Sequence, residues 1–175
     1  MAFENMLLFI LAVVIFLFSV TSLYAGFRAA LWVPTRRSDI ERVSRLTSAS
    51  PGQKFYDLGC GDGRLLCVMA GLGLEATGFE ISLPLFLAAR IRRLFQKDKK
   101  RIKILYRDFW RTNLNEADIV YLFLTPQTFP KLEKKFKNEL KKGTKVITYV
   151  WPFKCWQPIK TDIQKGRRSF YLYER

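Results

Sequence analysis

The sequence predicts an α/β domain, with a largely parallel sheet and helices on both faces, preceded by one N-terminal transmembrane helix. Three observations predict this arrangement. Short apolar runs that suit buried strands alternate with segments whose apolar residues recur at helical spacing, as over residues 85–95. A glycine-rich turn joins the first of these strands to a helix. Residues 6–25 carry no charge, and a helix of that length crosses about 30 Å of hydrocarbon.

Composition limits the classes of protein that remain. The 175 residues allow one domain with its own core and a short appendage. The excess of 30 Lys and Arg over 15 Asp and Glu, a formal charge of +15, favours anionic surfaces such as nucleic acid or lipid headgroups. The absence of histidine excludes a Ser-His or Cys-His triad and His-ligated zinc. The cysteines Cys60, Cys67 and Cys155 show neither metal-ligand spacing nor a paired framework, so we expect no metal and a reducing compartment.

The apolar run at residues 6–25 is interpreted as a permanent anchor. A cleaved signal peptide usually has a basic segment before its apolar core, whereas the only charged side chain before this run is Glu4. Positive charge follows the run, so the positive-inside rule places the domain of a single-pass protein on the cytoplasmic side. The residues behind this argument are the basic Arg28, Arg36 and Arg37 and the interfacial Tyr24 and Trp32.

We expect three parts in the chain: a transmembrane anchor over residues 1–27, a linker with an amphipathic lead-in helix over 28–52, and the α/β domain over 53–175. The lead-in helix is indicated by Ser38 and Glu41, which have the spacing of a capping box, and by an apolar repeat at every third residue. That repeat consists of Ile40, Val43 and Leu46.

The domain is organised around the stretch Asp57-Leu58-Gly59-Cys60-Gly61-Asp62-Gly63-Arg64. An apolar strand precedes it and a helix follows, so the glycines lie in a strand-to-helix turn. Such a turn brings backbone N–H groups and a helix N-terminus up to a ligand, and glycine is needed where a Cβ would block the approach. We therefore expect a ligand with a negative or dipolar group here.

The acids of this stretch favour S-adenosylmethionine over a dinucleotide. A dinucleotide site would want a third glycine where Arg64 stands, and Asp57 and Asp62 would repel its pyrophosphate. An amino-acid ligand has an ammonium for the acids and a carboxylate for the backbone N–H groups. Glu80, at the end of the next expected strand, suits two ribose hydroxyls, although its spacing fits NAD equally well. The candidate cofactor-binding residues from this part of the chain are Asp57, Gly59, Gly61, Asp62, Gly63 and Glu80.

A strongly basic helix is expected after Glu80. Ser82 suits its N-cap and Pro84 its first turn. Its basic part, from Arg90 to Arg101, is either a solvated surface or a contact with anionic headgroups, and we favour the headgroups. Its apolar face is expected to comprise Leu85, Ala88, Ala89, Ile91, Leu94 and Phe95.

The remaining elements continue the alternation. A helix from Phe129 to Leu140 is expected to end at Gly143 as its C-cap. Open α/β sheets place their chemistry at the C-terminal ends of strands, so the Thr125-Pro126 turn should face the substrate. The remaining strands are expected over Ile102–Tyr106, Ile119–Leu124 and Lys145–Val150, with a closing hairpin over Ile159–Ile163 and Ser169–Tyr173.

With its motifs in this order, the chain resembles the class I, seven-strand S-adenosylmethionine-dependent methyltransferases, whose Rossmann-like sheet begins with an acid followed by Gly-x-Gly-x-Gly. Within that class it resembles the small membrane-anchored protein-lysine methyltransferases, which include the enzymes acting on the mitochondrial ATP synthase c-subunit and the adenine nucleotide translocase. The motifs behind the narrower resemblance are Val33-Pro34-Thr35, Phe79-Glu80-Ile81, Asp108-Phe109-Trp110, Thr125-Pro126 and Trp151-Pro152-Phe153. The chain departs from this family at Cys60, where serine is frequent, and at Val150-Trp151, where Arg-Phe is frequent. The second departure leaves the substrate open.

The resemblance implies roles for further residues. Thr35 is expected to reach the cofactor, Asp108 to bind the adenine amino group, and Phe109 to pack on the adenine ring. A lysine stem and its methylated product would pass aromatic walls, through apolar contact and cation–π attraction. No residue is assigned as a general base. The substrate-channel candidates are Trp110, Thr125, Pro126, Trp151 and Phe153, with Phe123 beside them, and for each ring core packing is the alternative.

The resemblance also implies a membrane-associated protein substrate and a lipid bilayer as partners, at the mitochondrial membrane in a eukaryote. Two alternatives stay open: a methyltransferase of lipids or small molecules, and a non-catalytic membrane protein that binds S-adenosylmethionine. An NAD-dependent enzyme is disfavoured by Asp57 and Arg64. Nucleic acid is disfavoured as a partner, because the basic residues are scattered through helices without interleaved aromatics for base stacking.

Overall fold

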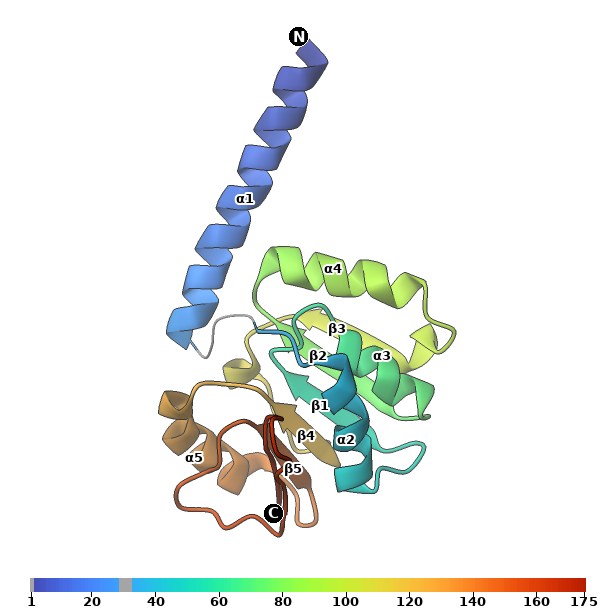
Figure 1. The fold of residues 1–175 in the computed structure, drawn as a ribbon, viewed down its shortest axis with the longest axis vertical. Helices are drawn as coiled ribbons and strands as arrows, with labels where there is room; N and C mark the ends of the chain where they lie inside the picture. The colour runs from blue at the N-terminus through green and yellow to red at the C-terminus, as the bar shows by residue number, and fades with distance from the viewer. Residues whose placement is uncertain (1, 29–32) are drawn as a thin grey trace.

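A computed structural model of the chain describes residues 2–28 and 33–175, shown in Figure 1. The expected interfacial residue Trp32 lies outside these ranges. The helices are α1 (Ala2–Arg28), α2 (Arg37–Thr47), α3 (Arg64–Gly71), α4 (Leu83–Leu94) and α5 (Phe129–Glu139), with 3-10 turns η1 (Lys99–Arg101), η2 (Phe109–Arg111) and η3 (Pro126–Thr128). The strands are β1 (Lys54–Leu58), β2 (Glu75–Glu80), β3 (Ile102–Tyr106), β4 (Ile119–Leu122), β5 (Lys145–Tyr149), β6 (Lys160–Asp162) and β7 (Phe170–Glu174).

Within the described ranges, one seven-stranded sheet has the order β3-β2-β1-β4-β5-β7-β6. The pairs among β1 to β5 are parallel, whereas β7 runs antiparallel to both β5 and β6. The predicted fold class and the closing hairpin are therefore confirmed. The direction of strand succession reverses between β1 and β4, and the C-terminal ends of strands beside such a point are where α/β sheets bind ligands.

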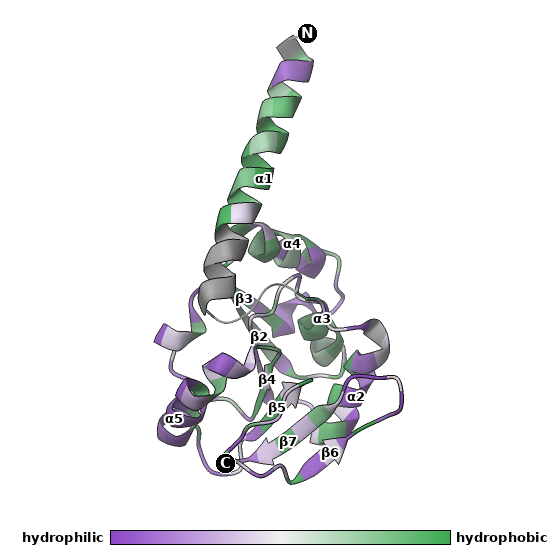
Figure 2. Cartoon of the chain, turned by 60° about the vertical axis from the view of Figure 1, so that its left-hand side comes forward, coloured by the Kyte–Doolittle hydropathy of each residue, from purple (hydrophilic) through white to green (hydrophobic). Residues whose placement is uncertain are grey.

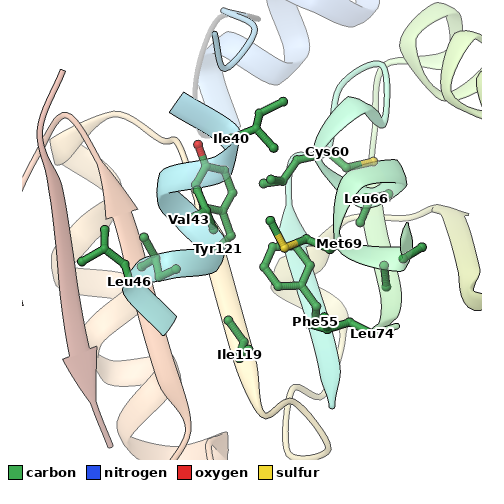
Figure 3. Close-up of a cluster of buried hydrophobic side chains, with 14 of the residues drawn as sticks. Ile40, Val43, Leu46, Phe55, Cys60, Leu66, Met69, Leu74, Ile119 and Tyr121 are labelled. Atoms are coloured by element: carbon green, nitrogen blue, oxygen red, sulfur yellow. The ribbon is translucent and has the colours of Figure 1, made fainter. Parts of the chain in front are cut away.

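Apolar layers cover both faces of the sheet. Successive residues of β4 alternate between the layers, with Ile119 and Tyr121 in one and Val120 and Leu122 in the other, as a strand buried on both faces requires. The first layer, drawn in Figure 3, joins α2 and α3 to the sheet through Ile40, Val43, Leu46, Leu66, Met69 and Phe55. The second joins α5 to the opposite face through Phe129, Leu132, Phe136 and Val146.

Two predicted helix caps were wrong. α2 begins at Arg37 with Arg36 as its N-cap and no side-chain cap bond, so Ser38 lies inside the helix and starts no capping box. α5 ends with Leu140 as its C-cap, and Gly143, at φ 83°, turns the chain toward β5 instead. In both cases the prediction used a local sequence signal, and the helix boundary lies one to three residues from the position that the signal indicated.

The apolar residues predicted for one face of α4 do not all face the core. Leu85 and Ala89 are buried against the domain, but Ile91, Leu94 and Phe95 are exposed. Two apolar stripes lie on different sides of this helix, and periodicity alone merged them into one face.

A buried ion-pair network ties α2 to the hairpin of β6 and β7, and the sequence analysis did not anticipate it. Arg42, 1% exposed, donates to Asp162 Oδ2 at 2.8 Å, to Asp39 Oδ1 at 3.0 Å and to the Arg168 carbonyl at 2.9 Å. The Tyr149 hydroxyl donates to the other Asp39 oxygen at 2.6 Å. The hydrogen bond with Asp162 raises the pKa of Arg42, and Arg42 lowers the pKa of Asp162. The network supplies partners to charges that would be costly to bury alone.

Helix α1 projects from the domain, as Figures 1 and 2 show. Its window Phe3–Val20 has a mean hydropathy of 2.4 and is 0% buried, so α1 is long and apolar enough to cross a membrane. The helix contacts α4, which lies at the edge of the domain from which α1 projects.

Gly78 in β2 lies directly beneath α3. A Cβ at this position would be 2.4 Å from Leu66 Cδ1 and 2.6 Å from Cys60 Sγ. We therefore expect Gly78→Ala to lower the free energy of unfolding by about 1–3 kcal/mol, the usual cost of overpacking, measured by chemical denaturation of the detergent-solubilised chain.

Gly71→Ala is the matched control for that substitution. A Cβ at Gly71, the last residue of α3, would meet nothing within 4 Å. Alanine favours the helix by up to about 1 kcal/mol over glycine, so this variant should be as stable as the parent or more stable. Equal loss of stability in both variants would contradict the close packing of α3 on β2.

Candidate functional site

A pocket lies at the C-terminal ends of β1, β2 and β4, where the strand order reverses. Ten of the residues predicted from sequence line it: Thr35, Asp57, Gly59, Gly61, Asp62, Glu80, Asp108, Phe109, Trp110 and Phe123. Among the described residues, the lining does not include Gly63, Thr125, Pro126, Trp151 or Phe153. The fold thus gathers in one place side chains that the sequence separates widely.

The glycine turn between β1 and α3 forms one wall of the pocket. Gly59, Gly61 and Gly63 have φ angles of 92°, 55° and 72°, a region that residues with a side chain rarely adopt. The Gly59 N–H donates to the Phe79 carbonyl at 3.0 Å, which holds the turn against β2. A Cβ on Gly63 would lie 3.1 Å from Ala89 Cβ in α4. Gly63 therefore serves the packing of α3 against α4 rather than the pocket wall.

Asp57 is a buried carboxylate that forms no hydrogen bond or ion pair with any described residue. It is 3% exposed and lies beside Tyr121 of the neighbouring strand. Burial, together with the charges of Glu80 and Asp62, raises the pKa of Asp57 well above its ordinary value. A buried charge of this kind is costly until a cation reaches it, so the arrangement favours a cationic group in the pocket.

Glu80 is held by backbone donors. Its Oε2 accepts the Gly61 N–H at 2.8 Å, and its Oε1 accepts the N–H groups of Ile81 at 2.9 Å and Ser82 at 2.8 Å. Burial raises the pKa of Glu80, and these backbone hydrogen bonds oppose the rise. A carboxylate has about four acceptor sites, so Glu80 retains capacity for a ligand hydroxyl.

Asp62 is neutralised by two arginines, neither of which was assigned this role from sequence. Arg64 Nη2 lies 2.7 Å and Arg92 Nη2 2.8 Å from Asp62 Oδ2. Burial alone would raise the pKa of Asp62, but the hydrogen bonds and charges of the arginines outweigh it and lower the pKa. Asp62 therefore fixes the turn to α4, and Arg64, which also lines the pocket, places a positive charge beside it. The Asp-x-Arg spacing was the signal that could have revealed the first pair.

Thr35 and Tyr121 close the side of the pocket nearest α2. Thr35 is 8% exposed, and its hydroxyl lies 2.8 Å from the Tyr121 hydroxyl. Burial raises the pKa of Tyr121 well above its ordinary value, so this hydroxyl stays neutral. The single tyrosine in an otherwise aliphatic β4 was the available sequence signal for Tyr121.

The third wall comes from the turn after β3. Asp108 caps η2 through one oxygen, which accepts the Trp110 N–H at 3.0 Å, so its other oxygen is available to a ligand. Phe109 is 6% exposed and forms an apolar surface in the pocket. Lys131 Nζ of α5 lies 4.4 Å from the centre of the Trp110 ring, so a cation already occupies one face of that indole.

Four of the other substrate-channel candidates do not line the pocket. Phe153 is 4% exposed and packs against Phe129 and Tyr173, so its ring belongs to the core. Trp151 is 46% exposed, and Thr125-Pro126 leads from β4 into η3. Phe123, the wall residue beside these candidates, does line the pocket.

The side chains that line the pocket determine which ligand it can bind. An ammonium suits Asp57, hydroxyls suit Glu80, and a flat ring suits Phe109 beside the free oxygen of Asp108. Within the described residues, no group of three or more His, Cys, Asp and Glu side chains could hold a metal ion. The arrangement therefore suits a zwitterionic nucleoside.

The strand order and the glycine turn between two acids are those of the class I methyltransferase fold. The chain belongs to the family described as the ANTKMT methyltransferase domain, whose family model matches residues 57–160.

Relatives and solved structures agree with this assignment. The chain is 32% identical over 143 residues to the rat lysine N-methyltransferase named for the ATP synthase c-subunit, a match that covers 82% of this chain and 65% of that protein. It is 30% identical over 152 residues to a "Protein-lysine N-methyltransferase" of Saccharolobus islandicus, which covers 81% of this chain and 91% of the relative. A solved RNA methyltransferase of Salinibacter ruber, in complex with S-adenosyl-L-homocysteine, superposes with a TM-score of 0.77 at 26% identity, covering 81% of this chain and 93% of that one. The chain thus spans less than two thirds of the rat relative's length.

Asp57 and Asp62 should respond oppositely to loss of charge. Because the pKa of Asp57 is raised in the folded state, holding it as a carboxylate costs stability, and the cost grows as pH rises from the ordinary Asp value through the raised pKa. We expect Asp57→Asn to raise the Tm of the ligand-free chain at neutral pH by at least about 2–4 °C, equivalent to about 1 kcal/mol.

Asp62→Asn is the control for that measurement. The pKa of Asp62 is lowered, so its ion pairs stabilise the fold above the ordinary Asp pKa and lose that effect as pH falls through the lowered value. Asp62→Asn should lower the Tm at neutral pH. The free energy of unfolding should fall by about 1–2 kcal/mol, the contribution of charge-assisted hydrogen bonds between partly exposed groups. Shifts of the same sign in both variants would refute the contrast between a partnered and an unpartnered carboxylate.

Proposed function

We propose that the chain is an S-adenosylmethionine-dependent protein-lysine N-methyltransferase that acts on a membrane-associated protein. The observation that carries the proposal is the buried, uncompensated Asp57 carboxylate in a pocket also lined by Glu80 and Phe109. Support for the acceptor comes from the rat and Saccharolobus relatives, which are both named as lysine N-methyltransferases.

The chain's own residues supply complementary groups for each part of this cofactor. Asp57 would pair with the ammonium, Glu80 would accept from the ribose hydroxyls, and Asp108 would accept from the adenine amino group beside Phe109. Arg64, which lines the pocket, would pair with the carboxylate, because the N–H groups of Gly59, Gly61 and Gly63 already donate to oxygens of the protein. When bound, S-adenosylmethionine supplies an activated methyl group on a sulfonium.

Positioning is the main task left to the protein. Displacement at a methyl group needs a neutral amine, held close and in line, and such positioning contributes a large part of catalysis. Phe123 and Leu124 line the pocket beyond β4 with apolar surface, which disfavours the protonated form of an incoming lysine. The rings of Trp110 and Phe123 would guide the lysine stem.

The membrane assignment follows from α1. Residues 1–27 would form a single-pass anchor, 28–52 a linker with the lead-in helix, and 53–175 the methyltransferase domain on the cytoplasmic side. The apolar, unburied window Phe3–Val20 supports the span, and the positive charge after it supports the orientation. The substrate for which the rat relative is named, the c-subunit of ATP synthase, fits an enzyme held at a membrane.

Asp57→Asn tests the cofactor assignment directly. Loss of the carboxylate should weaken S-adenosylmethionine binding at least about tenfold, since an ion pair in a desolvated pocket contributes about 1.5–3 kcal/mol. 5′-Methylthioadenosine lacks the amino-acid end, so its affinity should stay the same in titration calorimetry. Equal weakening of both ligands would place Asp57 elsewhere in the site, and unchanged binding of both would remove the assignment.

The acceptor is tested by label transfer. The full chain is incubated with methyl-labelled S-adenosylmethionine and membranes, and protein, lipid and RNA are then separated. We expect the label in protein, on lysine by mass spectrometry, and its loss with Asp57→Asn. Label in lipid would favour the amphiphile methyltransferase, and label in RNA would favour the activity for which the Salinibacter structure is named.

A further inference from the structure

Helix α4 presents to solvent a face that is more apolar than the face it buries. Its buried side contributes Leu85 and Ala89. Its outer side carries four large apolar residues that we call the α4 stripe: Leu87 (49% exposed), Ile91 (58%), Leu94 (60%) and Phe95 (81%). Residues spaced by three and four positions share one side of a helix, so the stripe is continuous. A contiguous apolar surface of this kind marks an interaction site on a soluble domain.

Basic side chains flank the stripe and outnumber the one carboxylate of residues 90–101, Asp98. Arg90, Lys97, Lys99 and Lys100 are exposed and form no ion pair with any described residue. Arg92 and Arg93, which the sequence analysis placed in the same basic surface, turn inward instead. Arg92 pairs with Asp62, and Arg93 donates to the Ile102 carbonyl at 2.7 Å. The surface that remains combines an apolar stripe with cations at its edge.

Helix α4 lies beside the apolar span. α1 contacts α4, and α4 lies at the edge of the domain from which α1 projects, as Figure 1 shows. In Figure 2 parts of α4, beside α1, are coloured hydrophobic as α1 is. If α1 crosses a bilayer, the surface of that bilayer meets the domain at α4.

We propose that α4 is a second membrane contact, with the α4 stripe in the interface of the bilayer and its flanking cations against anionic headgroups. The proposal rests on the membrane placement of α1 in the proposed function. A surface helix with an apolar face and basic edges binds in this way, and its affinity depends on anionic lipid. A second copy of the chain fits less well, because the same cations would then face each other.

The contact would also orient the pocket. Ile81, Ser82 and Leu85, at the start of α4, line the pocket, so the helix that meets the bilayer also forms the pocket edge. The pocket would then open close to the membrane surface, within reach of a lysine at the end of a transmembrane helix.

Added tryptophans test the contact in the full chain. Phe95→Trp reports the stripe, Ile163→Trp is the control at a similarly exposed residue (68%) near β6, and Phe9→Trp reports the anchor. Each variant is reconstituted in vesicles of phosphatidylcholine and phosphatidylglycerol with brominated acyl chains. An interfacial helix buries its apolar face about 5–10 Å deep in the bilayer. The brominated acyl chains of the lipids should therefore quench at least about half of the tryptophan emission added at position 95. The emission added at position 163 should remain.

Quenching at positions 95 and 9 distinguishes a failure of the α4 contact from a failure of the anchor. Quenching at position 9 without quenching at position 95 would overturn the α4 contact and leave the anchor. No quenching at position 9 would overturn both, while cofactor binding, measured separately by calorimetry, would still decide the enzymatic proposal. Vesicles of phosphatidylcholine alone should quench position 95 less, and equal quenching would refute the role of the cations. Shielding of position 95 from aqueous iodide without lipid quenching would assign the stripe to a second copy or another protein.

Discussion

Three carboxylates lie close together at the buried ends of β1 and β2, and the properties of the pocket depend on which partners balance each negative charge. Asp62 is neutralised by two arginines, and Glu80 is surrounded by backbone N–H groups. Among the described residues, Asp57 has neither an arginine nor a backbone N–H as a partner. The charges of Glu80 and Asp62 add to the cost of burying its carboxylate and raise its pKa. The fold therefore keeps one charge unbalanced at the point where a ligand enters. A ligand that supplies the missing cation stabilises the folded state as it binds.

The sequence alone was enough for the strands and for the acids at their ends, because both depend on short-range patterns. Apolar runs and turn residues located the strands to within a few residues, and Asp57 and Glu80 follow from the ends of two adjacent strands. The interactions that the sequence did not predict join residues far apart in the chain. Arg92 pairs with Asp62 from 30 positions away, and Tyr121 meets Thr35 across 86. The three-dimensional fold brings such partners together, and a local sequence pattern cannot predict these pairs.

Helix α4 shows a second limit of sequence reasoning. Its apolar residues fall on two sides, and periodicity reports that they recur without reporting which side faces the core. Only the packing of the small Ala89 against Gly63 in the turn shows which stripe is inside. The same limit applies to the aromatic loop after β5, where Phe153 is central to one layer of the core while Trp151, two residues earlier, is half exposed.

The bond between Arg42 and Asp162 joins residues 120 positions apart and has a consequence for biosynthesis. Residue 42 leaves the ribosome early, but its partner and strand β7, which lies between β5 and β6, are among the last parts of the domain to be made. Contacts between distant residues cannot form until both have been translated. The domain therefore stays open through most of its synthesis, and α1 leaves the ribosome while the chain behind it is still unfolded.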